Sequence, residues 1–123
     1  MLEPTEDWLM SILYQANRND TDTYRVFLTM RRYIYDTRDF VGMIEQITPT
    51  DIRFKPTTDL ADDCFFSVSM FAKHIDRRAV RRGSPSSGFY SKVGRNAFVQ
   101  IGYPGIAKNW RFWVSYIQER ICI

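Results

Sequence analysis

Histidine and cysteine are both scarce in this 123-residue chain. The only histidine is His74, and the two cysteines, Cys64 and Cys122, lie far apart and form no Cys-x-x-Cys pair. Zinc sites use clusters of cysteine and histidine ligands, so we expect no metal site and no cofactor. Two isolated cysteines in an intracellular chain are better explained as reduced, buried thiols than as a disulfide.

Long apolar runs are also missing. The longest nearly apolar stretch, CFFSVSMFA, covers residues 64–72 and is far shorter than the about 20 residues that a membrane-spanning helix needs. The first residues, MLEPTEDW, are acidic and lack the basic start and apolar stretch of a secretory signal. We therefore expect a cytoplasmic protein without a membrane span.

Acidic residues are few in the second half of the chain. Residues 1–63 hold 12 Asp or Glu and 7 Lys or Arg, whereas residues 64–123 hold 2 and 10, so the formal charges are −5 and +8. Of the 17 basic residues, 13 are arginine, whose planar guanidinium suits phosphate or carboxylate. This asymmetry predicts an acidic partner for the basic half, or pairing of the two halves within or between chains.

Periodicity predicts an all-α fold, a single compact domain of residues 1–123 with five or six helices. With 45% apolar and 15% aromatic residues, a chain of this length can bury a core without disulfides. An acidic half, 1–63, precedes a basic half, 64–123, and a connector rich in proline and threonine covers 48–59. The predicted helices cover residues 3–20, 21–35, 36–47, 60–82, 89–101 and 106–121.

Residues 60–82 are the predicted central helix. Asp59 is its expected N-cap and Gly83 its left-handed stop. Its apolar arc contains Leu60, Cys64, Phe65, Val68, Phe71, Ala72, Ile75 and Ala79. Phe66 and Met70 fall outside this arc, and we interpret them as a second buried face rather than as a contact surface.

The other helices also have predicted caps and buried faces. Thr21 or Asp22 is the expected cap of the second helix, and Ser86 or Ser87 that of the fifth. Gly94 is expected to let another helix approach closely. The predicted faces are Trp8, Leu9, Ile12 and Leu13 in the first helix, Tyr24, Phe27, Leu28, Ile34 and Tyr35 in the second, Phe89, Val93, Ala97 and Ile101 in the fifth, and Ile106, Trp110, Trp113, Val114, Ile117 and Ile121 in the last.

The stretch KHIDRRAVRRG, residues 73–83, has the densest positive charge. Cations in the last helical turn complement the helix dipole, which explains Arg81 and Arg82. The dipole explains Lys73 and Arg77 poorly, because they lie one to two turns earlier, opposite the apolar arc. The stretch is therefore either a solvated helix end or a binding face for an acidic partner, and we favour the binding face.

Further cations follow, with aromatic residues between them. Cations can neutralise phosphates, and exposed rings can stack on bases. Trp110 and Trp113 belong to the predicted core, which leaves Tyr103 and Phe112 as candidate exposed aromatic contacts. The candidate binding residues are Lys73, Arg77, Arg78, Arg81, Arg82, Lys92, Arg95, Lys108 and Arg111.

No sequence motif indicates catalysis. His74 has no carboxylate three or four residues away, and no nucleophile motif or phosphate-binding glycine loop is present. The acidic cluster of Asp59, Asp62 and Asp63 could hold Mg²⁺, but helix capping explains it more simply. We therefore expect a protein that is not an enzyme.

Three functional hypotheses remain, and the third, an enzyme, would need the fold to bring catalytic partners to His74. The first is a small helical, regulatory binding protein whose basic surface binds an acidic macromolecule. Nucleic acid is the commonest target of such a surface. The second is a protein–protein interaction subunit or regulator that assembles, as a homo-oligomer or with another acidic protein surface, by pairing the acidic half with the basic half.

Overall fold

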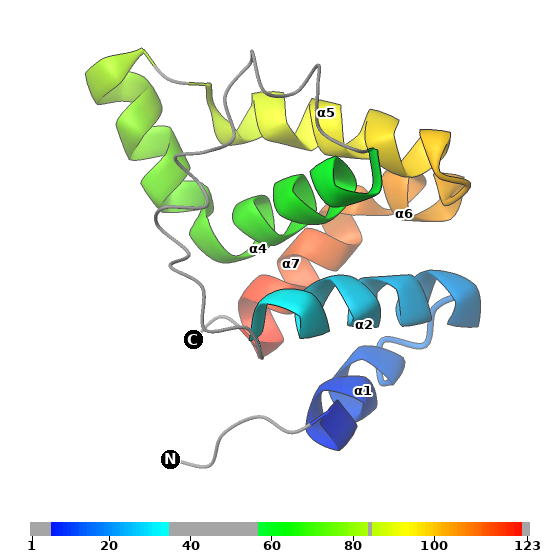
Figure 1. Ribbon diagram of the computed structural model, residues 1–123. Coiled ribbons are helices and arrows are strands. Elements are labelled where there is room, and N and C mark those ends of the chain that lie inside the picture. Colours follow the sequence, from blue (N-terminus) through cyan, green and yellow to red (C-terminus); the bar gives the residue numbers. More distant parts are fainter. Residues whose placement is uncertain (1–5, 35–56, 84, 122–123) are drawn as a thin grey trace. The chain divides into compact units, whose positions relative to one another are not determined.

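The computed structural model describes residues 6–34, 57–83 and 85–121. These residues contain six helices and no strand, which confirms the predicted all-α fold. The chain divides into two compact units, residues 1–38 and 39–123. The helices are α1 (Glu6–Tyr14), α2 (Asp20–Ile34), α4 (Thr57–Arg82), α5 (Ser87–Gln100), α6 (Pro104–Lys108) and α7 (Trp110–Arg120), as Figure 1 shows.

Some predictions fall on parts of the chain that are not described. The predicted third helix, 36–47, lies outside the described residues, as does most of the connector 48–59. Among the helices that are described, none is both long and apolar enough to cross a bilayer.

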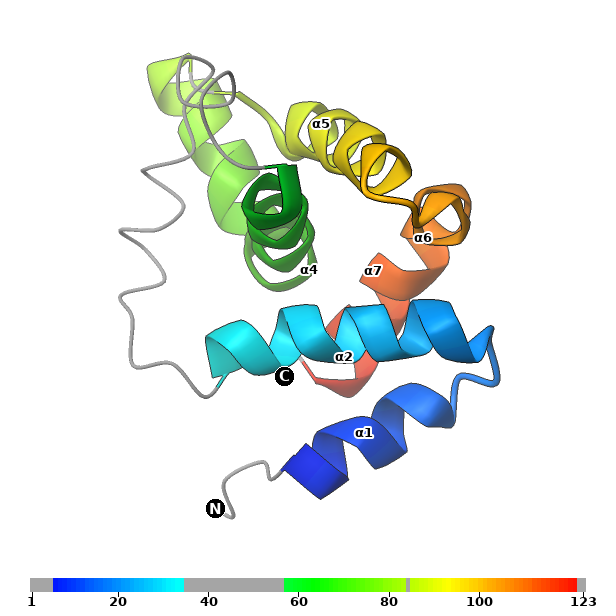
Figure 2. The same cartoon turned by 45° about the vertical axis from the view of Figure 1, so that its right-hand side comes forward.

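In the first unit, α1 and α2 form an antiparallel helical hairpin (Figures 1 and 2). Asn17 in the turn has a φ of 56°, a left-handed conformation that asparagine tolerates better than most residues. Asn19 is the observed cap of α2, because its Oδ1 accepts a hydrogen bond of 3.2 Å from the Asp22 N–H. The predicted caps, Thr21 and Asp22, instead lie in the first turn.

The buried face of α2 matches the predicted one only in part. Phe27 is buried as predicted, but Tyr24 is 48% exposed, whereas Val26, Met30 and Tyr33 are fully buried. Thr23 and Thr29 share the buried face, and their hydroxyls donate hydrogen bonds to main-chain carbonyls four residues earlier, at 2.8 and 3.1 Å. Because this bonding satisfies the hydroxyls internally, a face that looks polar in sequence can enter the core.

In α1, the predicted apolar stripe is only partly buried. Leu9 and Leu13 are fully buried, but Trp8 is 38% exposed. Glu6 in the first turn of α1 forms an ion pair with Arg31 of α2, with 2.6 Å between Oε1 and Nε. Both side chains are half-exposed, so the pair contributes little to stability.

In the second unit, α4 packs against both α5 and α7, and α5 runs antiparallel to the N-terminal half of α4 (Figure 1). Helix α4 begins at Thr57, so Asp59 lies in the first turn of α4 instead of capping it. A bend at Phe71, with φ −134° and ψ 23°, interrupts the helix. Gly83 ends it with a φ of 67°, as predicted, and its N–H bonds the Ala79 carbonyl at 3.1 Å.

The core of this unit is aromatic. The Phe65 ring lies 6.1 Å from that of Phe98 and 5.3 Å from that of Trp110. Phe66 is 1% exposed, which confirms a second buried face on α4, although Met70 is only partly buried. A Cβ on Gly94 would lie 2.5 Å from Trp110 Cη2 and 2.9 Å from Cys64 Cβ, so the expected close approach at Gly94 is confirmed.

This close approach explains why α5 turns a different face inward. Tyr90, Gly94, Ala97 and Phe98 are buried. Of the predicted face, Ala97 is confirmed, Val93 and Ile101 are only partly buried, and Phe89 is 37% exposed. The indole of Trp110 occupies the space beside Gly94, where there is no side chain. The orientation of α5 is therefore determined by this contact rather than by the apolar side chains of α5. Ser86 is the N-cap, as expected, because its Oγ accepts a 3.3 Å hydrogen bond from the Phe89 N–H.

The predicted last helix is divided in two. Pro104 occupies the first turn of α6, and α6 ends at Asn109, whose Nδ2 donates a 3.0 Å hydrogen bond to the Gly105 carbonyl. The predicted apolar face is otherwise confirmed. It supplies Ile106, Trp110, Trp113 and Ile117 to the core, while Val114 is only partly buried.

Candidate functional site

Two polar stripes with the same helical spacing lie on α5 and α7. Residues at i, i+3, i+4 and i+7 share one helix face. In α5 this stripe is Gly88, Ser91, Lys92 and Arg95, and in α7 it is Arg111, Val114, Ser115 and Gln118.

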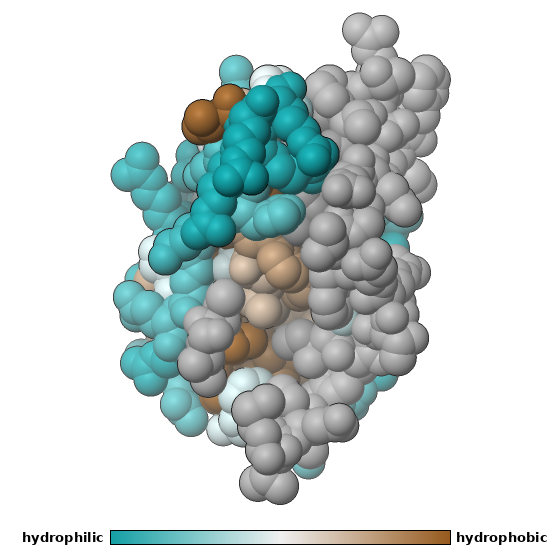
Figure 3. Space-filling view, turned by 90° about the vertical axis from the view of Figure 1, so that its left-hand side faces the viewer, coloured by the Kyte–Doolittle hydropathy of each residue, from teal (hydrophilic) through white to brown (hydrophobic). Residues whose placement is uncertain are grey.

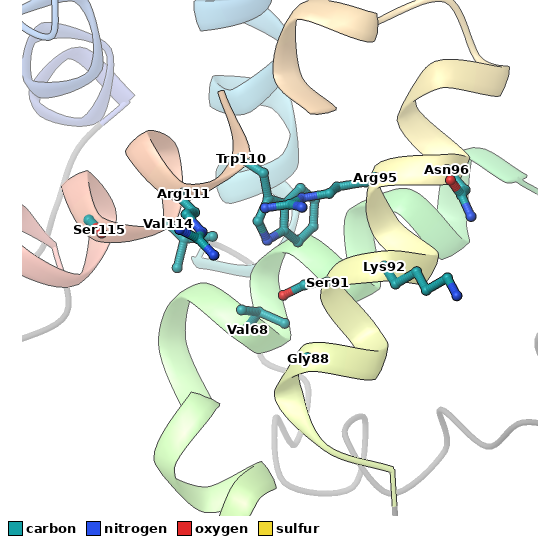
Figure 4. Close-up of a pocket in the computed structure, with 10 residues that line it drawn as sticks. All are labelled: Val68, Gly88, Ser91, Lys92, Arg95, Asn96, Trp110, Arg111, Val114 and Ser115. Carbon is teal, nitrogen blue, oxygen red and sulfur yellow. The ribbon is translucent and has the colours of Figure 1, made fainter. Parts of the chain in front are cut away.

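These stripes border a pocket of about 600 Å³, called here the α5–α7 pocket (Figure 4). Among the described residues, its lining contains three cations and no carboxylate. Lys92 and Arg111 are exposed, whereas Arg95 is half-buried. The lining consists of Val68, Gly88, Ser91, Lys92, Arg95, Asn96, Trp110, Arg111, Val114 and Ser115.

Trp110 gives this pocket a rigid wall. The indole is 2% exposed and is fixed by Gly94, Phe65 and Phe98. Arg95 extends from α5 toward it in Figure 4. The aromatic core therefore determines the relative position of the helices that carry the pocket cations. The spacing of these helices does not depend on a ligand.

A second hollow, the bend pocket, lies where α4 bends. It measures about 530 Å³, and Gln118 of α7 forms part of its wall. The remaining lining comes from α4: Ser69, Met70, Phe71, Ala72, Lys73, His74 and Arg77. None of its described lining residues carries a carboxylate.

A third hollow, the α4 hollow, lies on the C-terminal half of α4 and measures about 500 Å³. Lys73, Asp76, Arg77, Val80 and Arg81 line it. Asp76 accepts two hydrogen bonds from Ser87, at 2.8 Å from the N–H and 2.9 Å from Oγ. In Figure 3, hydrophilic side chains gather over this part of α4 at the top of the view, beside a hydrophobic area.

The structure brings the predicted cations together in two groups. Lys92, Arg95 and Arg111 line the α5–α7 pocket, and Lys73, Arg77 and Arg81 line the α4 hollow. In Figure 4, Arg95 extends toward Trp110, whereas Lys92 extends from α5 away from it. Lys108 and Arg82 are exposed but line none of the three hollows.

Arg78 lies apart from the other α4 cations. Its side chain is half-buried, and its charge acts on Tyr90 of α5. Burial raises the pKa of Tyr90 above its ordinary value, and the Arg78 guanidinium partly opposes that rise. Arg78 therefore belongs to the α4–α5 contact.

The candidate aromatic contacts are less accessible than predicted. Tyr103 and Phe112 are both half-buried, and the Phe112 ring lies 5.4 Å from Trp113 and 5.7 Å from Tyr116. Sequence reasoning missed the neutral lining residues Ser91, Asn96, Ser115 and Gln118. The repeated i, i+3, i+4, i+7 spacing was the available signal, but it became informative only when α5 and α7 were known to face each other.

Groups suited to catalysis or metal binding are dispersed. Asp62 and Asp63 are buried in α4, and within the described ranges no three His, Cys, Asp or Glu side chains are placed to hold a metal ion. His74 is exposed. Cys64 is a buried thiol, and Cys122 lies outside the described residues.

Comparison with known protein families, characterised proteins and solved structures finds no match to this chain.

Proposed function

We propose that this chain is a small non-enzymatic protein that binds nucleic acid through the basic surface of residues 64–123. The observation that carries the proposal is that Lys92, Arg95 and Arg111 all line one pocket, whose lining among the described residues includes no carboxylate. Lysine and arginine neutralise backbone phosphates and release counterions, which supplies the sequence-independent part of nucleic-acid affinity. An ion pair within the pocket would have cancelled this attraction.

The chemistry of the pocket supports phosphate as the group that is bound. Two of its three cations are arginines, whose fork of N–H donors matches phosphate oxygens. Serine and asparagine side chains, which also contact phosphate and sugar in nucleic-acid complexes, complete the polar part of the lining.

Fluorescence anisotropy of a labelled oligonucleotide, titrated with protein at several salt concentrations, tests this function. The variant Lys92→Glu/Arg111→Glu removes two pocket cations. Lys108→Glu/Arg120→Glu makes the same change of charge at two exposed residues outside the pocket. We expect the pocket variant to bind more weakly and to lower the slope of log K against log salt by about 0.7–0.9 for each lost phosphate contact.

The matched variant should keep most of that slope, because neither of its two residues lines the pocket. Equal losses in the two variants would show that the pocket is not the anchor. A wild-type protein that binds no nucleic acid at any salt concentration would overturn the proposed function.

One observation favours the alternative, an interaction subunit that pairs acidic and basic halves. Val80 is 88% exposed among Lys73, Arg77 and Arg81, and an apolar group within a cationic face suits an acidic protein surface. Sedimentation velocity across a range of concentrations separates the two functions. Self-association that Val80→Asp abolishes, without nucleic-acid binding, would favour this alternative.

A further inference from the structure

The α5–α7 pocket and the bend pocket lie along one face of α7. Arg111, Val114 and Ser115 line the first, and Gln118, one turn further on, lines the second. On α4 the transition is equally short, because Val68 borders the first pocket and Ser69 the second. The two pockets are therefore neighbours along the crossing of α4 and α7.

The bend pocket adjoins the α4 hollow, since Lys73 and Arg77 line both. The three neighbouring hollows define a path, and six cations line it: Lys92, Arg95, Arg111, Lys73, Arg77 and Arg81. Among the described lining residues the single carboxylate is that of Asp76, and both of its oxygens accept hydrogen bonds from Ser87.

We propose that this path binds a single strand of nucleic acid, with the phosphates following the cations and unpaired bases entering the hollows. This inference rests on the proposed function and names its substrate. The path changes direction where α4 bends at Phe71, and a single strand can follow that change. A duplex is stiff over about 150 base pairs and resists such bending.

The size of the hollows supports the same substrate. Cavities of about 500–600 Å³ fall within the range that accepts small organic groups. The bases of a duplex are paired and stacked inside the helix, so they cannot enter such cavities without being flipped out. An unpaired base meets the apolar surface of Met70 and Phe71 and the amide of Gln118 in the bend pocket.

Helix geometry gives the approximate length of the path. Arg111 to Gln118 spans about 10 Å of α7, and Lys73 to Arg81 spans about 12 Å of α4, at 1.5 Å per residue. A stacked strand advances about 3.4 Å per nucleotide and an extended one more. The path therefore contacts about six nucleotides or fewer, near the lower end of the site sizes of single-strand-binding domains.

A pair of matched glutamine variants tests the path. Gln118→Glu places a negative charge at its middle, and Gln100→Glu makes the same change at an exposed residue near the end of α5, outside all three hollows. We expect Gln118→Glu to weaken binding of a labelled single strand about fivefold at low salt. Gln100→Glu should bind within a factor of two of wild type, and circular dichroism should show both variants folded.

In parallel, the affinity for one oligonucleotide is measured with the oligonucleotide supplied as a single strand and as a duplex. We expect the single strand to bind more tightly, with a salt slope that increases with strand length up to about six nucleotides. Equal or tighter binding of the duplex overturns this inference, as do equal effects of the two glutamine variants, and both results leave the proposed function intact. Failure to bind either form overturns both.

Discussion

At the scale of single residues, Gly94 lies where three helices of the second unit meet. Its missing side chain makes room for the Trp110 indole, and Cys64 of α4 lies on the same side. One residue thus brings α4, α5 and α7 together. The same contact holds Trp110 at the wall of the α5–α7 pocket, so core packing and pocket geometry depend on one position.

We expect Gly94→Ala to destabilise the protein by about 1–3 kcal/mol, the usual cost of overpacking a core. The added Cβ would lie 2.5 Å from Trp110 and 2.9 Å from Cys64 Cβ. Both the indole ring and the Cβ of Cys64, which is bonded directly to the backbone of α4, would have to move. Urea unfolding followed by circular dichroism measures the change.

Gly88→Ala is the matched control in the same helix. A Cβ there meets only the Ser86 hydroxyl at 3.6 Å, an ordinary contact. Because alanine is the better helix former, the control should be neutral or stabilising by up to about 1 kcal/mol. Equal stability of the two variants would mean that α5 does not approach Trp110 as described.

At the scale of helices, Asp76 and Ser87 connect the end of α4 to the start of α5. Ser87 is the first residue of α5, so its N–H has no partner within the helix, and the Asp76 carboxylate supplies one. A carboxylate at a helix N-terminus is also favoured by the helix dipole. The connection fixes the C-terminal half of α4, which departs from the direction of the first half at Phe71.

We expect Asp76→Ala to cost about 0.5–2 kcal/mol in unfolding free energy, less than for a buried charged hydrogen bond because the site is exposed. Ser87→Ala should cost less, because it removes the hydroxyl bond but leaves the N–H bond. The double variant should be less destabilised than the sum of the two singles, as contacting residues are.

Thermal unfolding of the four proteins in this cycle measures the coupling. Glu119→Ala, which removes another exposed acid from α7, should stay within about 0.5 kcal/mol of wild type. Strict additivity of Asp76→Ala and Ser87→Ala would show that the two side chains do not interact.

Most of the described helices could be predicted from sequence, because apolar spacing and the caps at Ser86 and Gly83 are local properties, but the division of the last helix into α6 and α7 was not predicted. The inward faces of α2 and α5 could be predicted only in part. Thr23 and Thr29 can be buried because their hydroxyls form hydrogen bonds with main-chain carbonyls four residues earlier. The orientation of α5 depends on the absence of a side chain at Gly94, which makes room for Trp110. The pattern of hydrophobic residues along the chain indicates neither the burial of the threonines nor the orientation of α5.

The candidate site was predictable in its charges but not in its shape. The sequence indicates that Lys92, Arg95 and Arg111 are cations outside the predicted apolar faces. Their convergence depends on α7 returning to face α5, a contact between distant parts of the sequence. The neutral residues Ser91 and Gln118 could be assigned only after that contact was known.

At the scale of the whole molecule, positive charge is concentrated in the second half while the acidic excess of the first half is partly hidden. Asp62 and Asp63, counted in the acidic half, are each only 4% exposed. In contrast, Lys73, Arg77 and Arg81 are all exposed. Less acidic charge is therefore available at the surface than the sequence count of the first half suggests.

We expect Arg77→Glu/Arg81→Glu to weaken nucleic-acid binding and to reduce its salt slope by about 0.7–0.9 for each lost contact. The fold should persist because both side chains are exposed. Loss of Arg81 from the last turn of α4 should cost a few tenths to about 1 kcal/mol through the helix dipole. Anisotropy titrations and thermal unfolding measure the two effects separately.

A double variant that binds as wild type and only melts earlier would show that this cluster is a helix cap. A variant that fails to fold would show that the cluster pairs internally with acidic residues, which would explain the charge asymmetry without an external partner.

The packing of Trp110 against Phe65 and Phe98 also sets an order of events during protein synthesis. A ribosome releases α4 and α5 before α7, so both helices can form from local hydrogen bonds while the space beside Gly94 is still empty. At this stage Phe65 and Phe98 lack their contact with Trp110, which is synthesised later. Contacts distant in sequence form slowly, and exposed apolar surface favours aggregation while a chain is incomplete. Docking of α7 therefore covers the apolar surface that Phe65 and Phe98 expose on the nascent chain.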